Sequence, residues 1–241
     1  MLEWTTGKVI DIQDETPSTK KFFIQIQNTN DFVFEPGQFV TLDLPIHEQK
    51  NKRWRSYSIA SAPNGTNVIE LIIVLLEGGA GTNYLFNNVS VGSELTLRGP
   101  QGKFTLPKII DKDLFLICTG TGIAPFRSMA KHLQNFSIEH KNIHIIFGCR
   151  KFPDALYFNE LNALQKTHAN FFYHPAFSRE ETVNEGQYKG YVHQVYEQLL
   201  ATDKRPAKFY LCGWKNMIDE AKQRIIALGY DKKDIHLELY G

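Results

Sequence analysis

The sequence has few cysteines, and they stand far apart. Its 241 residues include only Cys118, Cys149 and Cys212, so neither a disulfide framework nor a closely spaced metal site is expected. An iron–sulfur cluster normally takes four cysteine ligands, so we expect no cluster and no metal here. The odd number of cysteines favours a reducing compartment, and we expect a cytoplasmic protein.

Net charge and long apolar runs are also scarce. The formal net charge is +1, which argues against a general role in binding nucleic acid or membrane surfaces. The longest apolar run, Leu71–Leu76, is far too short to span a bilayer, and the first residues lack the apolar core of a signal peptide. With 42% hydrophobic and 22% charged residues, the sequence is typical of a globular protein.

The first half of the chain has short alternating segments separated by glycine and proline. One helical interruption, Thr82–Asn87, follows the cluster Gly78–Gly81, and Thr82 is its expected N-cap. This pattern predicts a closed antiparallel β-barrel, which we place at residues 1–105. The expected strands are Lys8–Ile12, Thr19–Ile26, Gln38–Leu44, Arg55–Ser61, Val68–Leu76 and Glu94–Arg98.

After Pro107 the pattern changes to strands that alternate with helices. This alternation predicts a doubly wound parallel sheet within a domain at residues 106–241. Loops that follow such strands gather at the carboxyl edge of the sheet, where nucleotides bind. The expected strands are Leu114–Cys118, Asn142–Gly148, Phe171–Ala176, Lys208–Cys212 and Ile235–Leu239, and the expected helices are Pro125–Asn135, Ala155–Gln165, Val192–Ala201 and Lys215–Leu228.

A glycine turn, Thr119–Gly122, joins the first of these strands to the first helix. Its bare backbone and the unpaired N–H groups of the helix start can face a phosphate, and Pro125 suits the first helical turn. The Rossmann spacing is not met, because Pro125 stands where the third glycine would fall. An ordinary strand-to-helix turn is the alternative interpretation.

The segment Arg55–Ser58 carries polar chemistry on a strand. Alternation places Arg55 and Tyr57 on one face and Ser56 and Ser58 on the other. A guanidinium beside a phenol ring can hold a phosphate and stack a planar heterocycle. A solvated strand face is the alternative here, and a flexible loop is the alternative to an anion site at Gly78–Gly81.

Five segments, in this order, resemble motifs of the ferredoxin–NADP reductase superfamily. RSYSIAS at Arg55–Ser61 is similar to R-x-Y-S-x-x-S, and YLCGW at Tyr210–Trp214 with Met217 is similar to C-G-x-x-x-M. The other three segments are GGAGTNYL at Gly78–Leu85, GPQGKF at Gly99–Phe104 and TGTGIAP at Thr119–Pro125. The resemblance covers nearly the whole chain and implies an FAD-binding barrel followed by an NAD(P)-binding domain.

By this resemblance, Arg55 would hold the FAD pyrophosphate and Tyr57 would stack on the isoalloxazine. Ser58 would hydrogen-bond near flavin N5, where hydride arrives. Threonine at position 82 stands where the family often has serine, and it keeps the hydroxyl. The barrel residues expected to bind cofactor are Arg55, Ser56, Tyr57, Ser58, Gly81, Thr82 and Asn83.

The resemblance also implies roles near the nicotinamide. Cys212 would guide the ring at C4, although a small buried residue at a strand end is the alternative. Tyr240 would cover the flavin until it is displaced, with Glu238 as a polar partner. The sequence adds Gly241 after the E-x-Y ending that the family shows. The residues expected to act in catalysis are therefore Ser58, Cys212, Glu238 and Tyr240.

Ser178-Arg179-Glu180 followed by Lys189-x-Tyr191 resembles the 2′-phosphate clamp of plant-type reductases, which favours NADP(H) over NAD(H). A solvated loop is the alternative, and Arg150 is either a further phosphate contact or a helix-flanking charge. The residues expected to bind the nucleotide are Thr119, Gly120, Thr121, Gly122, Pro125, Arg150, Ser178, Arg179, Lys189, Tyr191, Cys212, Gly213, Met217 and Tyr240.

The implied activity is that of an FAD-dependent ferredoxin– or flavodoxin–NAD(P)H reductase. Hydride would pass from NAD(P)H to FAD, and electrons would then pass to a separate carrier such as ferredoxin, flavodoxin or an oxygenase component. A flavin or ferric reductase is one alternative, and an FAD-binding electron-relay subunit with an idle nucleotide site is another. The basic run Lys50, Lys52 and Arg53 could steer an acidic carrier, unless it is only a solvated loop.

Overall fold

A computed structural model describes residues 3–201 and 204–240. Contacts divide the chain into two compact units, one of residues 1–106 with 124–137 and the other of residues 107–123 with 138–241. Within the described ranges, no helix has both the length and the apolar character needed to cross a bilayer.

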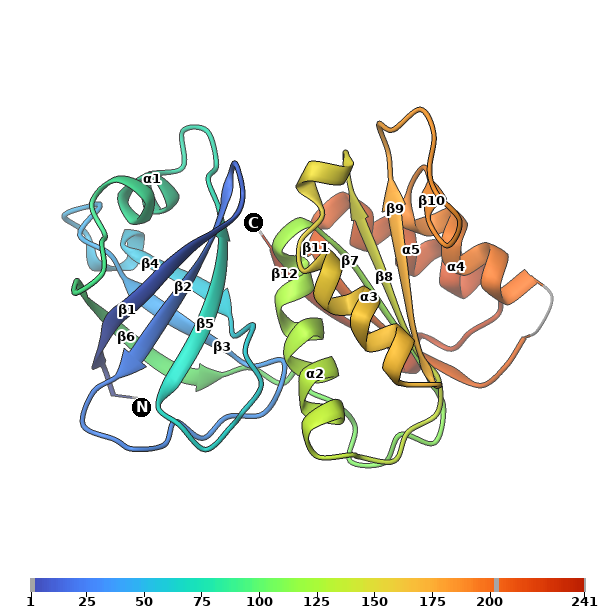
Figure 1. The fold of residues 1–241 in the computed structure, drawn as a ribbon, viewed down its shortest axis with the longest axis horizontal. Helices are drawn as coiled ribbons and strands as arrows, with labels where there is room; N and C mark the ends of the chain where they lie inside the picture. The colour runs from blue at the N-terminus through green and yellow to red at the C-terminus, as the bar shows by residue number, and fades with distance from the viewer. Residues whose placement is uncertain (1–2, 202–203, 241) are drawn as a thin grey trace. The chain divides into compact units, whose positions relative to one another are not determined.

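The first unit is built on a six-stranded antiparallel sheet in the order β4-β3-β6-β1-β2-β5 (Figure 1). A β-bridge between Ile59, just after β4, and Leu71 of β5 joins the two ends of this order and closes the barrel. The predicted antiparallel barrel is therefore confirmed. Its strands are β1 (Thr5–Thr16), β2 (Thr19–Ile26), β3 (Phe39–Asp43), β4 (Trp54–Ser58), β5 (Val68–Val74) and β6 (Glu94–Gln101), with a short 3-10 helix η1 at Lys50–Lys52.

Period-two alternation explains which side chains fill the barrel. On β5, Ile69, Leu71 and Ile73 belong to the apolar core, so Glu70 faces the outer side of the strand. Helix α2 (Ile123–Asn135) groups with this unit from residue 124 onward and packs Phe126 against Phe104 with ring centroids 5.8 Å apart. The outer face of β5 is buried as well, because Glu70 is only 4% exposed.

Helix α1 (Ala80–Asn87) begins two residues earlier than predicted, and its N-cap is Gly79. The expected N-cap role of Thr82 is therefore wrong. Thr82 lies within the first helical turn, where its Oγ1 accepts from the Leu76 N–H (3.1 Å) and donates to the Gly79 carbonyl (3.1 Å). The hydroxyl is satisfied by the preceding loop, so it does not cap the helix.

The second unit contains a six-stranded parallel sheet in the order β10-β9-β8-β7-β11-β12, which confirms the predicted doubly wound domain. The two-residue strand β10 was not predicted, because two residues carry no periodic signal. The strands are β7 (Asp113–Thr119), β8 (Ile143–Cys149), β9 (Phe171–Phe177), β10 (Tyr188–Lys189), β11 (Ala207–Trp214) and β12 (Ile235–Tyr240). The helices are α3 (Phe158–Thr167), α4 (Val192–Ala201) and α5 (Lys215–Ala227), with 3-10 helices η2 (Gly120–Gly122), η3 (Phe152–Asp154) and η4 (Lys232–Asp234).

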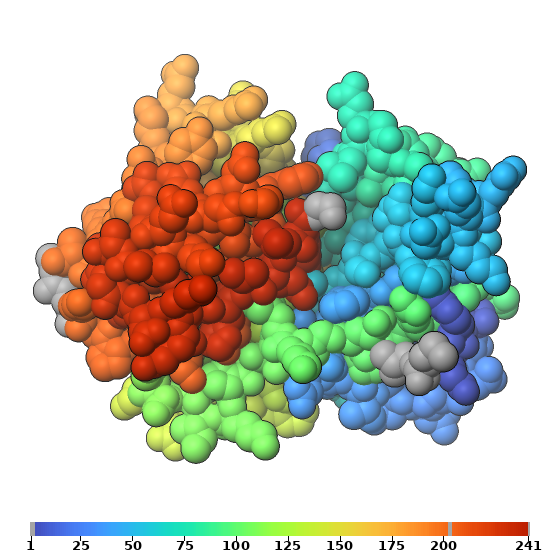
Figure 2. Space-filling view, turned by 180° about the vertical axis from the view of Figure 1, so that it is seen from behind, coloured from blue at the N-terminus to red at the C-terminus, as the bar shows by residue number. Residues whose placement is uncertain are grey.

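Helices lie on both faces of this sheet. On one face, α4 and α5 pack on a core that includes Phe115, Phe209 and Val195, while on the other Phe158 of α3 contacts Tyr173 of β9. Helix α5, red in Figure 2, forms part of the surface of the unit. Helix α3 starts three residues later than predicted, because η3 and a left-handed Tyr157 (φ 53°) precede it.

The strand order reverses beside β7. The chain runs outward from β7 through β8 and β9 to β10, and then returns to place β11 and β12 on the other side of β7. The carboxyl ends of β7 and β11 therefore flank the topological switch point, where α/β sheets bind ligands.

Candidate functional site: two cofactor half-sites

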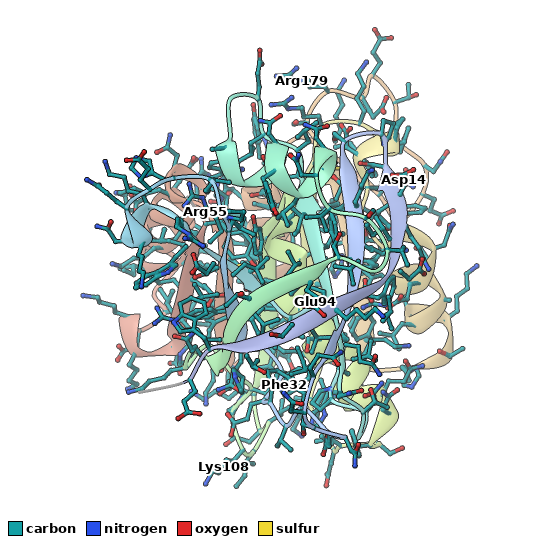
Figure 3. The ribbon with its side chains drawn as sticks, turned by 90° about the vertical axis from the view of Figure 1, so that its left-hand side faces the viewer. Asp14, Phe32, Arg55, Glu94, Lys108 and Arg179 are labelled. Atoms are coloured by element: carbon teal, nitrogen blue, oxygen red, sulfur yellow. The ribbon has the colours of Figure 1, made fainter. Side chains whose placement is uncertain are left out.

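On the barrel, Arg55 of β4 runs along the first turn of α1. A Cβ on Gly81 would lie 3.0 Å from Arg55 Cγ and 3.1 Å from its Nε, so a glycine leaves room for the arginine stem. Arg55 Nη1 donates to the carbonyls of Lys52 (3.0 Å) and Trp54 (2.8 Å), which orients the guanidinium; Figure 3 labels this residue. A fixed cation beside a helix N-terminus suits a phosphate group.

The neighbouring residues of β4 alternate as predicted. Tyr57 pairs with Val40 of the core strand β3, whereas Ser56 pairs with Thr41 and shares a 3.0 Å hydrogen bond between the two hydroxyls. Burial raises the pKa of Tyr57 to about 12, and the nearby Arg55 charge opposes this only in part. The phenol therefore stays protonated at neutral pH. Ser58 is buried at the end of the strand, with 4% of its surface exposed.

The first turn of α1 uses its polar side chains locally. Asn83 Nδ2 donates to the Gly79 carbonyl (2.9 Å), and the Thr82 hydroxyl bonds the same oxygen. A ligand at this helix start would therefore meet backbone N–H groups and Arg55, with Thr82 and Asn83 shaping the loop around it.

At the edge of the parallel sheet, the turn that follows β7 packs closely against the end of β11. The chain passes from Thr119 through η2 directly into α2, and Pro125 lies in the first turn of that helix as predicted. A Cβ on Gly122 would lie 2.4 Å from the Cys212 carbonyl oxygen, and a Cβ on Gly213 would lie 2.7 Å from Thr119 Oγ1 and 3.0 Å from Met217 Cε. The structure thus brings both glycine segments and Met217 together.

The Thr119 hydroxyl at this place is buried, and within residues 3–201 and 204–240 it has no hydrogen-bond partner. Buried hydroxyls almost always have a partner, so this atom is suited to a ligand oxygen. An NAD(P) phosphate or ribose oxygen has the required chemistry, and Thr121 and Gly120 lie in the same turn. The residues present therefore fit the nucleotide.

Cys212 lies beside the last strand. It pairs in register with Glu238 of β12, and a side-chain hydrogen bond joins it to Tyr240. Burial raises the pKa of the Cys212 thiol well above its usual value, and Glu238 and Cys118 add to the effect. A neutral, fully buried thiol is not an activated nucleophile. Gly241, the residue that the sequence adds after Tyr240, lies outside the described residues.

The ends of β8 and β9 carry the candidate 2′-phosphate residues. The Arg179 N–H donates to the Arg150 carbonyl (2.9 Å), so the two arginines stand on adjacent backbone segments. The Ser178 hydroxyl donates to the Cys149 carbonyl (3.3 Å) next to them. Arg179, which Figure 3 labels, can offer the two parallel N–H groups that bind a phosphate.

Strand β10 brings two more candidates to this end of the sheet. Lys189 pairs with Phe177, and its Nζ donates to the Glu181 carbonyl (3.1 Å). Tyr191 follows and is 67% exposed, so its ring is accessible to a ligand. The structure therefore gathers Lys189 and Tyr191 with the two arginines on neighbouring segments of one unit.

One buried ion pair was missed from the sequence. Arg127 Nη1 of α2 contacts Glu70 Oε2 of β5 at 2.8 Å, and the two side chains are 13% and 5% exposed. A signal was present in the printed sequence, because each residue is a single charge within an apolar run, VIELIIV and IAPFRSMA. A charge in a buried segment requires a partner.

Comparison with known proteins identifies both units. Residues 6–106 match the family described as an oxidoreductase FAD-binding domain, and residues 116–223 match an oxidoreductase NAD-binding domain. Ferredoxin–NADP reductase B of Sorangium cellulosum is 30% identical over 240 residues, which cover 97% of this chain and 96% of that protein. The phenol hydroxylase P5 protein of Acinetobacter pittii is 31% identical over 234 residues, and this chain spans 64% of its length.

Solved structures share the fold. A ferredoxin NADP⁺ reductase from Neisseria gonorrhoeae with bound FAD and NADP has a TM-score of 0.82 at 25% identity, covering 99% of both chains. A cytochrome P450 reductase from Amycolatopsis has a TM-score of 0.87 at 23% identity and covers 99% of this chain and 70% of its own, so it bears on the fold alone. The chain belongs to the ferredoxin–NADP reductase superfamily and is an FAD-dependent oxidoreductase.

Proposed function

We propose that this protein oxidises NADPH and delivers electrons through FAD to a separate protein carrier. The observation that carries the proposal is the buried Thr119 hydroxyl, which has no partner among the described residues and lies at the carboxyl edge of the parallel sheet. Bound FAD accepts a hydride and can release its electrons one at a time. The side chains of this protein bind, orient and shield the two cofactors.

On the barrel, Arg55 holds the FAD pyrophosphate at the start of α1, where Gly81, Thr82 and Asn83 form the cradle. Tyr57 provides the stacking surface for the isoalloxazine, and its protonated phenol remains a hydrogen-bond donor. Ser58 contacts the flavin near N5, and Ser56 supports it on the adjacent face of the strand. These roles place charge, ring and hydroxyl along one short segment.

On the parallel sheet, the backbone of Thr119, Gly120, Thr121 and Gly122 binds the nucleotide pyrophosphate, with Pro125 opening α2 behind it. Gly213 and Met217 complete this surface. Cys212 guides the nicotinamide ring as a neutral thiol, consistent with its raised pKa. Tyr240 shields the flavin until the nicotinamide displaces it, and Glu238 is the polar neighbour of both.

We favour NADP(H) over NAD(H), because several cations lie at the ends of β8, β9 and β10. Arg179 binds the 2′-phosphate, assisted by Arg150, Ser178 and Lys189, while Tyr191 offers an exposed ring to the adenine. A guanidinium forms two parallel hydrogen bonds with a phosphate, and this contact is lost with NADH.

The proposed domain division is residues 1–105 for FAD and residues 106–241 for NAD(P), which is close to the matched family ranges 6–106 and 116–223. The carrier is a ferredoxin, a flavodoxin or an oxygenase component, because the relatives include a ferredoxin–NADP reductase and an anthranilate 1,2-dioxygenase electron transfer component. The free cysteines suit a cytoplasmic location.

The test is spectroscopic. The purified protein should show flavin absorbance, and anaerobic addition of NADPH should bleach it faster than NADH does. Separate assays with ferredoxin and with free flavin or ferric salts then identify the acceptor. A strong preference for small acceptors would favour a flavin or ferric reductase, and failure of both nicotinamides to bleach the flavin would favour a relay subunit.

A further inference from the structure

Helix α2 is anchored to the barrel at the point where the barrel closes. Arg127 Nη1 donates to the Ala60 carbonyl (2.9 Å) and to Glu70 Oε2 (2.8 Å). One residue further along α2, the buried Ser128 hydroxyl donates to the Ser61 carbonyl (2.7 Å). Both α2 residues therefore hydrogen-bond to the two-residue segment, Ala60 and Ser61, that follows the bridge at Ile59.

This segment is itself tied to β5. The Ala60 N–H donates to the Glu70 carbonyl (2.8 Å), and the Glu70 N–H donates to the Ser61 hydroxyl (3.0 Å). The backbone of Glu70 is thus bonded to Ala60 and Ser61, and its carboxylate is bonded to Arg127. Removing Arg127 would leave a buried carboxylate without its cation, which is far more costly than losing an exposed pair.

The anchor stands close in the chain to residues of each proposed half-site. Gly122 lies five residues before Arg127, and the start of α2 spans this interval, which is about 8 Å at the rise of an α-helix. Ser58 precedes Ala60 by two residues, about 7 Å in extended chain. Both connections are short, so Arg127 lies near the start of the helix that follows the glycine turn and near the end of β4.

We propose that Arg127 is a positioning residue for hydride transfer. Paired with Glu70, it fixes the start of α2, the helix into which the Thr119–Gly122 turn runs, on the segment that follows Ser58. The inference rests on the proposed function, because it assigns the turn to the nucleotide and Ser58 to the flavin. Arg127 is not among the residues proposed to bind either cofactor, so its loss should lower the rate of hydride transfer while the affinities for FAD and NADPH stay unchanged.

The first measurement is anaerobic stopped-flow reduction of the FAD-loaded enzyme by saturating NADPH. Arg127→Ala should slow flavin reduction about tenfold or more, with the dissociation constants of FAD and NADPH changed by less than about twofold. Arg127→Lys, which keeps the charge, should recover part of the rate. A matched control is Lys131→Ala, one turn later on α2, because Lys131 Nζ donates to Gln134 of the same helix.

The second measurement is amide hydrogen exchange without nucleotide. In Arg127→Ala, exchange should accelerate at residues 59–61 and in the first turns of α2, while the core strands of the parallel sheet keep wild-type protection. If Arg127→Ala does not fold, Arg127→Lys and Glu70→Gln carry the same two measurements, with smaller slowing expected.

A wild-type reduction rate in these variants would overturn the proposal. The proposal would also fail if weaker binding of NADPH or FAD fully explained the slowing. It would fail as well if Lys131→Ala slowed flavin reduction equally. If the wild-type protein is reduced by neither nicotinamide, the proposed function fails instead, and the exchange data still decide whether Arg127 anchors α2.

Discussion

Gly122 packs against the main chain of Cys212, and a Cβ at Gly122 would lie 2.4 Å from the Cys212 carbonyl oxygen and 2.9 Å from its carbon. Backbone atoms cannot rotate away as a side chain can, so Gly122→Ala must separate the ends of β7 and β11. We expect a rise in KM for NADPH of about tenfold or more, with unchanged FAD content.

Gly65→Ala is a suitable control for this steric effect. Its backbone has a positive φ of +73°, which the backbone of Gly122 does not, and nothing lies within 4 Å of an added Cβ. It should cost about 1 kcal/mol of stability and leave KM for NADPH unchanged. Equal kinetic effects from the two alanines would show that the Gly122–Cys212 contact has no special role in nucleotide binding.

Arg55→Ala should lower the FAD content of the purified protein, because a phosphate charge would lose its fixed cation. The measurement is the ratio of flavin to protein absorbance, followed by titration of the apoprotein with FAD, where we expect affinity to fall about tenfold or more. Arg53→Ala is the control, since Arg53 pairs with Asp43 at 2.7 Å. A fully yellow Arg55→Ala protein would remove Arg55 from the FAD site.

Arg179→Ala should raise KM for NADPH about tenfold while hardly changing that for NADH, because only NADPH carries the 2′-phosphate. Steady-state kinetics with both nicotinamides at constant ionic strength provide the measurement. Equal effects on the two cofactors would assign Arg179 to a shared part of the nucleotide or to the solvated loop.

Tyr240→Ser should improve the use of NADH if the ring of Tyr240 covers the flavin. The smaller side chain removes the group that a nicotinamide must displace, and NADH gains more because it lacks the 2′-phosphate contact. The measurement is kcat/KM for NADH. Unchanged kinetics would make Tyr240 a simple strand end that hydrogen-bonds to Cys212.

Two buried histidines predict acid sensitivity. His144 Nδ1 lies 3.1 Å from His174 Nε2. The other ring nitrogen of His174, Nδ1, lies 3.2 Å from the Tyr188 hydroxyl. Burial lowers the pKa of His144 to about 4, with a smaller effect of the Arg205 charge, and burial lowers that of His174 to about 3, helped by His144. Asp113 lies 4.0 Å from His144 Nε2.

Both folded pKa values, about 4 and about 3, are below the unfolded value near 6.5. Between these pH values the unfolded chain therefore binds more protons than the folded chain. Stability is therefore complete above about pH 6.5 and falls as the pH drops, by at most about 2.7 kcal/mol per pH unit for two protons. Urea unfolding at a series of pH values should show this slope, and His174→Gln should reduce it. An unchanged slope would exclude His174 as a source.

Much of the fold follows from local patterns in the sequence. Buried runs such as Leu114–Cys118 mark central parallel strands, and alternation marks the barrel strands, so both sheets could be predicted. The N-cap of α1 could not, because the choice between Thr82 and Gly79 depends on where the preceding loop places the Leu76 N–H. The apolar runs around Arg127 and Glu70 indicate that each charge needs a partner, but the two residues stand 57 positions apart and no local pattern says that they pair with one another.

The candidate site shows the same division. Motif residues such as Arg55 and Thr119 could be named from spacing and resemblance, but their surroundings could not. The approach of Gly81 to Arg55 and the unpartnered Thr119 hydroxyl depend on how distant segments pack. Chemistry-bearing residues were therefore predictable, while the contacts that orient them required the structure.

The membership of α2 has a consequence for protein engineering. Residues 124–137 follow β7 in the chain but belong by contact to the barrel. A chimera joined at Leu106 would combine a barrel from one relative with α2 from another, and so would match Glu70 of one parent with the Arg127 position of the other. Functional exchange of nucleotide specificity between relatives should therefore succeed only when crossover points keep these two positions from a single parent.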